Sequence, residues 1–213
     1  MRYAATLLVC LLLSTCAAWA DKSWEYEFRP DASVGGPSGL VAIPNAFTVP
    51  AHSVAAFVNR INAGVDYWTS GVNIGGRANL GMAEPLGVEF GITAIDPETP
   101  AKETIANFKV GGNSGKWALG AGAIDLTDQT NRTLYFVATR RVGCLDSPGG
   151  LSLGFGSNDT NKNLDGLFLG LDAGIVTLEH DAEETNLGVR LGPLRLGWIS
   201  GDFYSGLVMR TQF

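Results

Sequence analysis

The sequence predicts an all-β fold: an antiparallel up-and-down transmembrane β-barrel of about 12 strands (10–14) joined by short loops. Three observations lead to this prediction. Residues 1–20 have the pattern of a secretory signal peptide. Apolar residues alternate with small or polar ones from residue 52 to the last residue. No run of 18 apolar residues follows residue 20, so we expect no transmembrane helix.

Composition excludes several classes of protein. The chain of 213 residues has a net charge of −6, which argues against nucleic acid as a partner because phosphate binding needs clustered Lys and Arg. Glycine is abundant, at 28 residues, but it has no three-residue period and therefore does not indicate collagen. With three Cys and two His, no tetrahedral zinc site is expected. We predict no metal site and no cofactor.

The first segment, residues 1–20, is the predicted signal peptide. Arg2 supplies its positive charge, Leu7 to Leu13 its apolar core, and Ala18-Trp19-Ala20 a small-x-small cleavage site. Two alternatives stay open: a membrane anchor, and lipidation at Cys16, because the residues before Cys16 resemble a lipobox.

The second segment, residues 21–51, contains four Pro and holds no period for long. We interpret it as an extended periplasmic leader with turns. The alternative is that it enters the lumen of the barrel as a plug.

The third segment, residues 52–213, is the predicted barrel. Leu207 and Met209 fall on one face of the last strand, and Gly206 and Val208 fall on the other. The same alternation recurs between turn signals rich in Gly, Pro, Asn and Asp. It predicts strands that begin near residues 53, 67, 86, 104, 117, 132, 151, 166, 175, 185, 194 and 204.

The residues on the less apolar face of each strand, called here the second face, indicate which face points out of the barrel. The second face carries Gly, Ser, Asn and isolated charges rather than many Lys, Glu and Thr, which favours a confined lumen over a water-exposed surface. A soluble periplasmic β-sandwich that binds a ligand is the alternative. The residues available for aromatic girdles are Tyr67, Trp68, Trp117, Tyr135, Trp198 and Tyr204. Charged residues of the second face are expected to form a ladder of charges in the lumen. The candidate members of this luminal charge ladder are Arg60, Arg77, Glu89, Lys109, Asp172, Glu179, Arg190 and Arg210.

Catalytic residues are not expected. His180 is predicted to face outward near a loop, His52 precedes the first strand, and no Gly-x-Ser-x-Gly elbow is present. A lipid-modifying barrel enzyme is therefore the weaker alternative. A set of loop acids could offer oxygen ligands to a divalent cation, but solvated side chains are the simpler interpretation: Asp159, Asp165, Asp181, Glu183 and Glu184.

Two stretches of the sequence have a distinctive pattern. One is the leader motif of Gly39-Leu40 and Ile43-Pro44-Asn45-Ala46, which has the form G-L-x-x-x-P-x-A. The other is the series of C-terminal hairpins, with Asn186-Leu187-Gly188-Val189-Arg190 after the acidic strand at Glu179. Both stretches resemble the YjbH-type family of outer-membrane barrel proteins. The resemblance implies an outer-membrane barrel and an association with exopolysaccharide production.

These observations together predict a non-enzymatic barrel of a Gram-negative outer membrane. Its expected role is in exopolysaccharide production or export, or as a narrow pore. The expected partners are outer-membrane lipid, the barrel-insertion machinery and polysaccharide or export components. The final Phe213, at the end of an alternating strand, resembles the C-terminal insertion signal of such barrels.

Overall fold

The computed structural model describes residues 31–33, 36–62, 66–80, 85–97, 103–130, 132–144, 147–159 and 164–213. The predicted signal peptide, with Cys16 and the cleavage site after Ala20, lies outside these ranges. No helix in the described part of the chain is long and apolar enough to cross a membrane.

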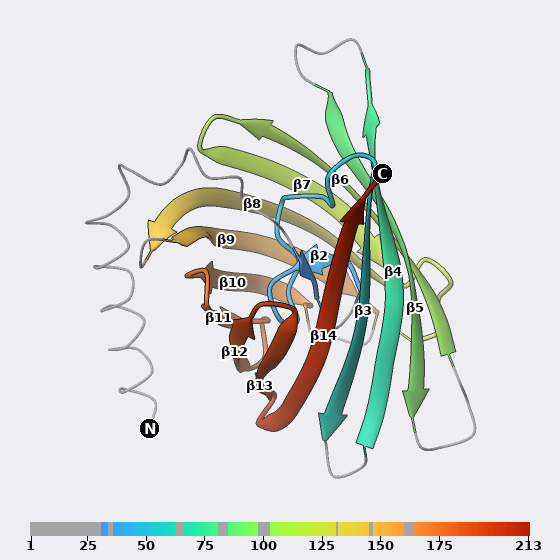
Figure 1. Ribbon diagram of the computed structural model, residues 1–213. Helices are drawn as coiled ribbons and strands as arrows, with labels where there is room; N and C mark the ends of the chain where they lie inside the picture. The colour runs from blue at the N-terminus through green and yellow to red at the C-terminus, as the bar shows by residue number, and fades with distance from the viewer. Residues whose placement is uncertain are drawn as a thin grey trace.

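Twelve antiparallel strands close into an up-and-down barrel in which each strand pairs with its neighbours in sequence (Figure 1). The seam joins β14 to β3, from Phe203 opposite Asn62 to Gln212 opposite Ser53. The predicted antiparallel up-and-down barrel of about 12 strands is therefore confirmed, and the β-sandwich alternative is wrong because the sheet closes on itself. The barrel strands are β3 (Ser53–Asn62), β4 (Asp66–Ala78), β5 (Leu86–Pro97), β6 (Glu103–Ser114), β7 (Trp117–Ile124), β8 (Thr133–Cys144), β9 (Ser147–Asn158), β10 (Gly166–Asp172), β11 (Val176–His180), β12 (Thr185–Leu191), β13 (Leu194–Ile199) and β14 (Asp202–Gln212).

The strand starts agree closely with the alternation of the sequence. The largest difference is at β9, expected near residue 151 and observed from Ser147. Residues 147–150, which belong to one of the turn signals rich in Gly and Pro, pair with β8 instead. The wall of the barrel is uneven: β4 has 13 residues, whereas β11 has 5 (Figure 1). Strands β10 to β13, with five to seven residues each, form the shortest part of the wall.

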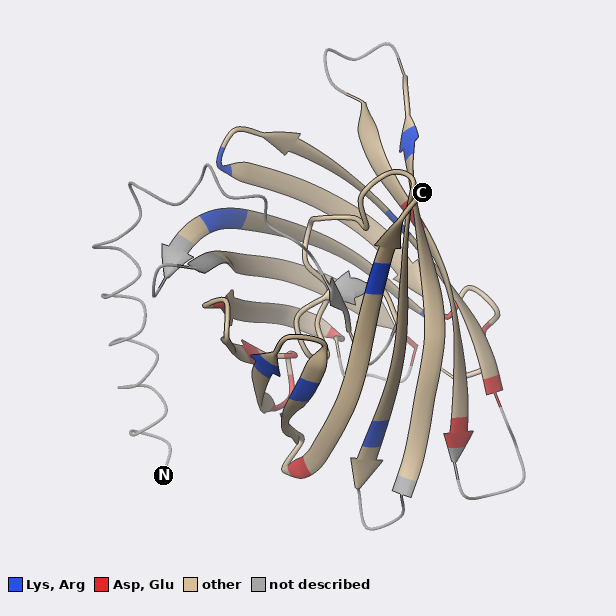
Figure 2. Cartoon of the chain, viewed as in Figure 1, with Lys and Arg blue, Asp and Glu red and all other residues tan. Residues whose placement is uncertain are grey.

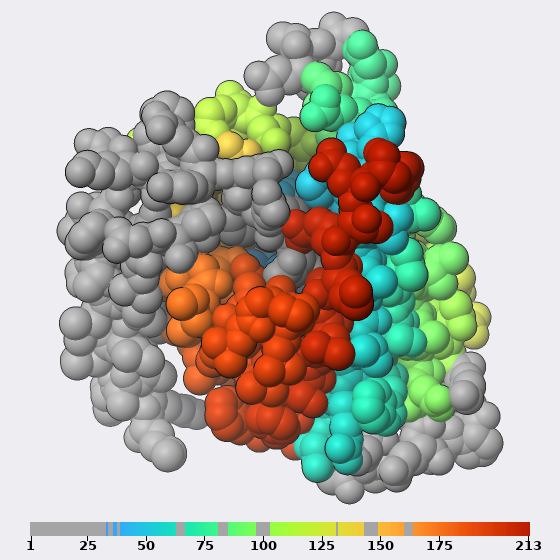
Figure 3. All heavy atoms as spheres, in the orientation of Figure 1, coloured from blue at the N-terminus to red at the C-terminus, as the bar shows by residue number. Residues whose placement is uncertain are grey.

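Large apolar side chains point outward around the barrel, as the alternation predicted. In Figure 3, β10 to β14 and the neighbouring β3 to β5 form one continuous outer surface. Charged side chains on this surface lie near strand ends, such as Arg60 and Arg140. The exposed apolar residues on outward strand positions include Val72, Ile74, Phe90, Ile92, Phe108, Leu119, Leu134, Phe136, Leu153, Phe155, Leu167, Leu169, Trp198, Leu207 and Met209.

The part of the leader after residue 35 occupies the interior of the barrel. Residues 36–51, named here the luminal segment, contain the short strand β2 (Ser38–Gly39), which pairs with β1 (Asp31–Ala32). Leu40, Ile43 and Phe47 are buried against the inward-facing Val137 and Phe168. Figure 1 shows this segment in blue, enclosed by the strands. The core of the protein is therefore the contact between the luminal segment and the inner wall.

Candidate functional site

The tip of the luminal segment is held by one carboxylate. The segment turns back on itself at Gly39–Pro44, where the Leu40 amide donates to the Ile43 carbonyl. The amides of Val41 and Ala42 donate to the two oxygens of Glu179, at 3.0 and 2.6 Å, and that of Ile43 does so at 3.5 Å. Successive backbone N–H groups that converge in this way form an anion-binding nest. Glu179 on β11 therefore anchors the turn to the wall.

Asn186 completes the anchor. Its amide nitrogen donates to Glu179 at 3.1 Å and to Asp181 at 3.0 Å, and all three side chains are buried. Glu179 was among the predicted luminal charges, whereas no role was predicted for Asn186, because an Asn at an inward strand position has no distinguishing pattern.

A second polar contact fixes the outgoing half of the segment. Lys109 on β6 lies opposite Glu89 on β5, with 3.7 Å between the ammonium nitrogen and a carboxylate oxygen. The Lys109 ammonium also donates to the carbonyls of Asn45 and Phe47, and the Val49 amide donates to Glu89 at 2.8 Å. A buried ion pair needs such additional hydrogen bonds to offset desolvation. Backbone groups of the luminal segment thus provide the hydrogen-bond partners of the buried Lys109–Glu89 pair.

Glycines on the inner wall let the segment approach closely. A Cβ at Gly75 would lie 2.1 Å from the Pro50 carbonyl oxygen, and one at Gly111 would lie 2.3 Å from that of Ala46. Neither distance is compatible with a side chain unless backbone moves. The small residues of the second face are therefore explained by a packed segment, and the leader motif that ends at Ala46 supplies the small residue that meets Gly111 and Gly120.

The luminal charges do not form a single ladder. Arg190 pairs with Asp172 at 3.2 Å, across the intervening strand β11. Arg77 and Arg210 occupy inward positions and line the hollows where the segment leaves the barrel. Arg60 is a correction: it points outward, and its guanidinium lies 5.9 Å from the Trp68 ring centroid.

The aromatic girdle also needs correction. Trp68, Trp117 and Trp198 are exposed on the outer surface, as expected. Tyr135 and Tyr204 are instead buried on the inner wall, and Tyr67 packs partly buried behind Tyr204. Alternation puts Tyr204 on the inner face with Gly206 and Val208, so the pattern itself argues against a girdle position for it. Tyr135 could not be placed by alternation, because residues 134–137 are apolar or aromatic on both faces and the luminal segment makes the interior a second apolar environment.

The two ends of the barrel differ in charge (Figure 2). At the end where β3 begins and β14 stops, named here the termini end, two hollows of about 450 and 590 Å³ flank Pro50. Their charged lining consists of Arg77, Arg141, Arg190, Arg195 and Arg210. The opposite end is mainly acidic, with Asp96, Glu103, Asp125, Asp128, Asp159, Asp165, Asp181, Glu183, Glu184 and Asp202.

One acidic side chain orders a loop at the acidic end. Asp125 follows β7 and accepts hydrogen bonds from the Thr127 hydroxyl and from the amides of Gln129 and Thr130. Burial raises the pKa of Asp125, but these hydrogen bonds outweigh it and lower the pKa to about 2. The role of Asp125 is structural and was not predicted from the sequence.

The remaining candidates lie apart from one another. His180 is exposed on the outer surface, and His52 is exposed beside Phe213, whose amide donates to the His52 carbonyl. Phe213 itself is exposed just beyond β14. Within the described residues, no three His, Cys, Asp or Glu side chains gather as a set of metal ligands.

Comparison with known proteins gives no relative: no protein-family model, no curated protein and no solved structure matches this chain.

Proposed function

We propose that this protein is a non-enzymatic outer-membrane β-barrel whose lumen is closed by its own luminal segment. The observation that carries the proposal is the outer surface, on which apolar side chains occupy the middle of the strands while Arg60 and Arg140 lie near the ends. Water-soluble proteins rarely expose a continuous apolar surface of this extent, whereas a transmembrane barrel needs one.

The height of the apolar band fits a membrane. From Leu86 to Ala94 on β5, outward positions are apolar over eight residue steps, or about 27 Å along a strand. A strand tilt of about 40° reduces this to about 20 Å, close to the band of about 25 Å typical of outer-membrane barrels. Trp68 near one end and Trp117 near the other suit the two interfaces.

The interior supports a closed state. Glu179, Lys109 and Glu89 use their charges to bind backbone groups of the luminal segment, so opening a pore requires those contacts to break. With an even number of strands both ends of the barrel sequence lie on one side, which we place in the periplasm.

Electrophoresis with and without boiling tests the proposal. The mature protein, extracted from outer membranes in detergent, should migrate faster on SDS gels when unheated, because a closed barrel resists SDS. Recovery from the aqueous fraction without detergent, with no heat-dependent shift, would overturn it.

A second candidate role is binding of an acidic polysaccharide at the termini end. The arginine-lined hollows favour it, because clustered guanidinium groups bind carboxylates well. Retention of the protein by immobilised polygalacturonate, weakened by salt and absent on neutral dextran, would support this role; equal retention on both would contradict it.

A further inference from the structure

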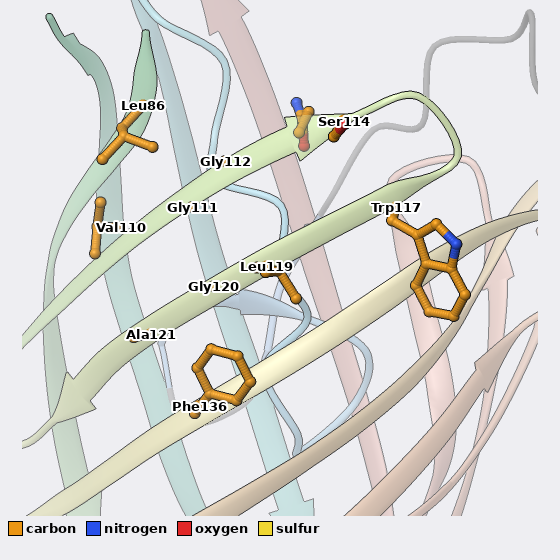
Figure 4. Close-up of a pocket in the computed structure, with 11 residues that line it drawn as sticks. Leu86, Val110, Gly111, Gly112, Ser114, Trp117, Leu119, Gly120, Ala121 and Phe136 are labelled. Carbon is orange, nitrogen blue, oxygen red and sulfur yellow. The ribbon is translucent and has the colours of Figure 1, made fainter. Parts of the chain in front are cut away.

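A groove of about 600 Å³ crosses the outer surface over β5 to β8 near the termini end (Figure 4). It opens on the outer surface, and it shares only Gly111 and Asn113 with the arginine-lined hollow beside Arg77. Figure 4 shows Leu86 and Val110 on one side and Leu119, Phe136 and Trp117 on the other. Its volume lies within the range of about 300–1,000 Å³ typical of small-molecule sites.

Small residues at outward positions create the groove. Val110 lies opposite Ala121, and Gly112 lies opposite Leu119, so the β6–β7 pair presents little side chain between its larger neighbours. A Cβ at Gly112 would already lie 3.0 Å from a Leu86 methyl group. The result is an apolar slot that follows the strands toward the turn at residues 115–116.

A cation lies at the polar rim of this slot. Arg140 is the strand partner of Trp117 and is exposed, and its guanidinium carbon lies 5.8 Å from the Trp117 ring centroid. Ser114 adds a hydroxyl at the same rim, and no Asp or Glu occupies an outward position on β6, β7 or β8. An apolar slot that ends at a tryptophan and an arginine complements an acyl chain joined to a phosphate.

We propose that the groove binds one glycerophospholipid of the periplasmic leaflet, with an acyl chain along Leu119 and Phe136 and the phosphate at Arg140. This inference rests on the proposed membrane location. It adds a specific lipid site to the general lipid contact of a barrel.

Two variants change the groove without touching the lumen. Ala121→Phe fills the slot from an outward position, and Arg140→Gln removes the cation at the rim. Each has a matched control: Ala94→Phe adds the same ring elsewhere on the outer surface, and Arg60→Gln removes the arginine that stacks on Trp68 at the other end.

Native mass spectrometry in mild detergent, with dioleoyl phosphatidylglycerol added in steps, measures the binding. The wild type and both controls should retain one lipid. Ala121→Phe and Arg140→Gln should each weaken retention about tenfold, which corresponds to ~1.4 kcal/mol. The heat-dependent gel shift verifies that every variant folds. If Ala121→Phe does not fold, the comparison of Arg140→Gln with Arg60→Gln is sufficient to test the site.

Three results would overturn the site: no retained lipid on the wild type, equal retention by all variants, or equal loss in the Arg60→Gln control. If the wild type is extracted from membranes and shows the gel shift but retains no lipid, only the lipid site fails. If it is recovered without detergent, the membrane proposal fails as well.

Discussion

Replacing Glu179 with Ala should release the tip of the luminal segment. The carboxylate accepts hydrogen bonds from three consecutive amides. Glu179 is 2% exposed, so the loss falls on a site that the segment keeps largely free of water.

The expected magnitude follows from these contacts. The bonds to Ala42 and Val41, at 2.6 and 3.0 Å, have good lengths, whereas the bond to Ile43 at 3.5 Å is weak. Hydrogen bonds to a charged group contribute about 1.5–3 kcal/mol each, so the two good bonds give at least ~3 kcal/mol. This corresponds to an increase of about 10² in the opening equilibrium of the tip.

Hydrogen exchange measures that equilibrium directly. The amides of Val41 and Ala42 should exchange about 10²-fold faster in Glu179→Ala, while amides of the β3–β4 ladder should not change. Glu179→Gln keeps one oxygen and should give a smaller effect. His180→Ala, on the next residue but facing outward, is the control.

Unchanged exchange at Val41 and Ala42 would refute the anchoring role of Glu179. Equal acceleration of exchange throughout the barrel would also refute it, since that would indicate general loss of stability rather than release of the segment.

Three further predictions test other contacts. Gly75→Ala should displace the luminal segment and increase its cleavage by protease. Gly76→Ala should not, because a Cβ at Gly76 has no neighbour nearer than 3.9 Å. Equal cleavage of the two variants would contradict the close packing of the segment on Gly75. Ile92→Arg, in the middle of the apolar band, should lower the free energy of unfolding in phospholipid vesicles by about 2–4 kcal/mol. Trp68→Arg, near the interface, should lower it by about 0–1 kcal/mol. Equal decreases in the free energy of unfolding would argue against a membrane-embedded band. The pKa of Asp125, about 2 when folded, lies below its unfolded value, so its stabilisation is complete above that unfolded value and is lost as pH falls toward 2. The difference in melting temperature between wild type and Asp125→Asn should therefore stay constant from pH 7 to about 5 and shrink below that; a difference that changes between pH 7 and 5 would contradict this.

The strands could be predicted because the outer surface imposes a strict period. Residues such as Leu207 and Met209 alternate with small or polar neighbours, and this pattern sets both the strand and its face. Arg60 shows where the rule fails. Strand β3 has Ala55 and Phe57 on the inside and Ala56 and Val58 on the outside, so hydrophobicity does not distinguish the faces.

The interior could be predicted only in part. The inward positions of Glu89, Lys109 and Glu179 follow from alternation, but their function depends on contacts with residues 41–49 that are far away in the sequence. Glycine content indicated a crowded interior without identifying the leader as its cause. The roles of Asn186 and Asp125 likewise arise from tertiary hydrogen bonds that leave no local pattern.

Planar-bilayer conductance is the most direct test of a barrel closed by its own leader. The mature wild type should insert and show no stepwise conductance, whereas a variant that lacks residues 33–48 and retains the heat-dependent gel shift should show discrete channels. Equal conductance of the two proteins would contradict closure by the luminal segment.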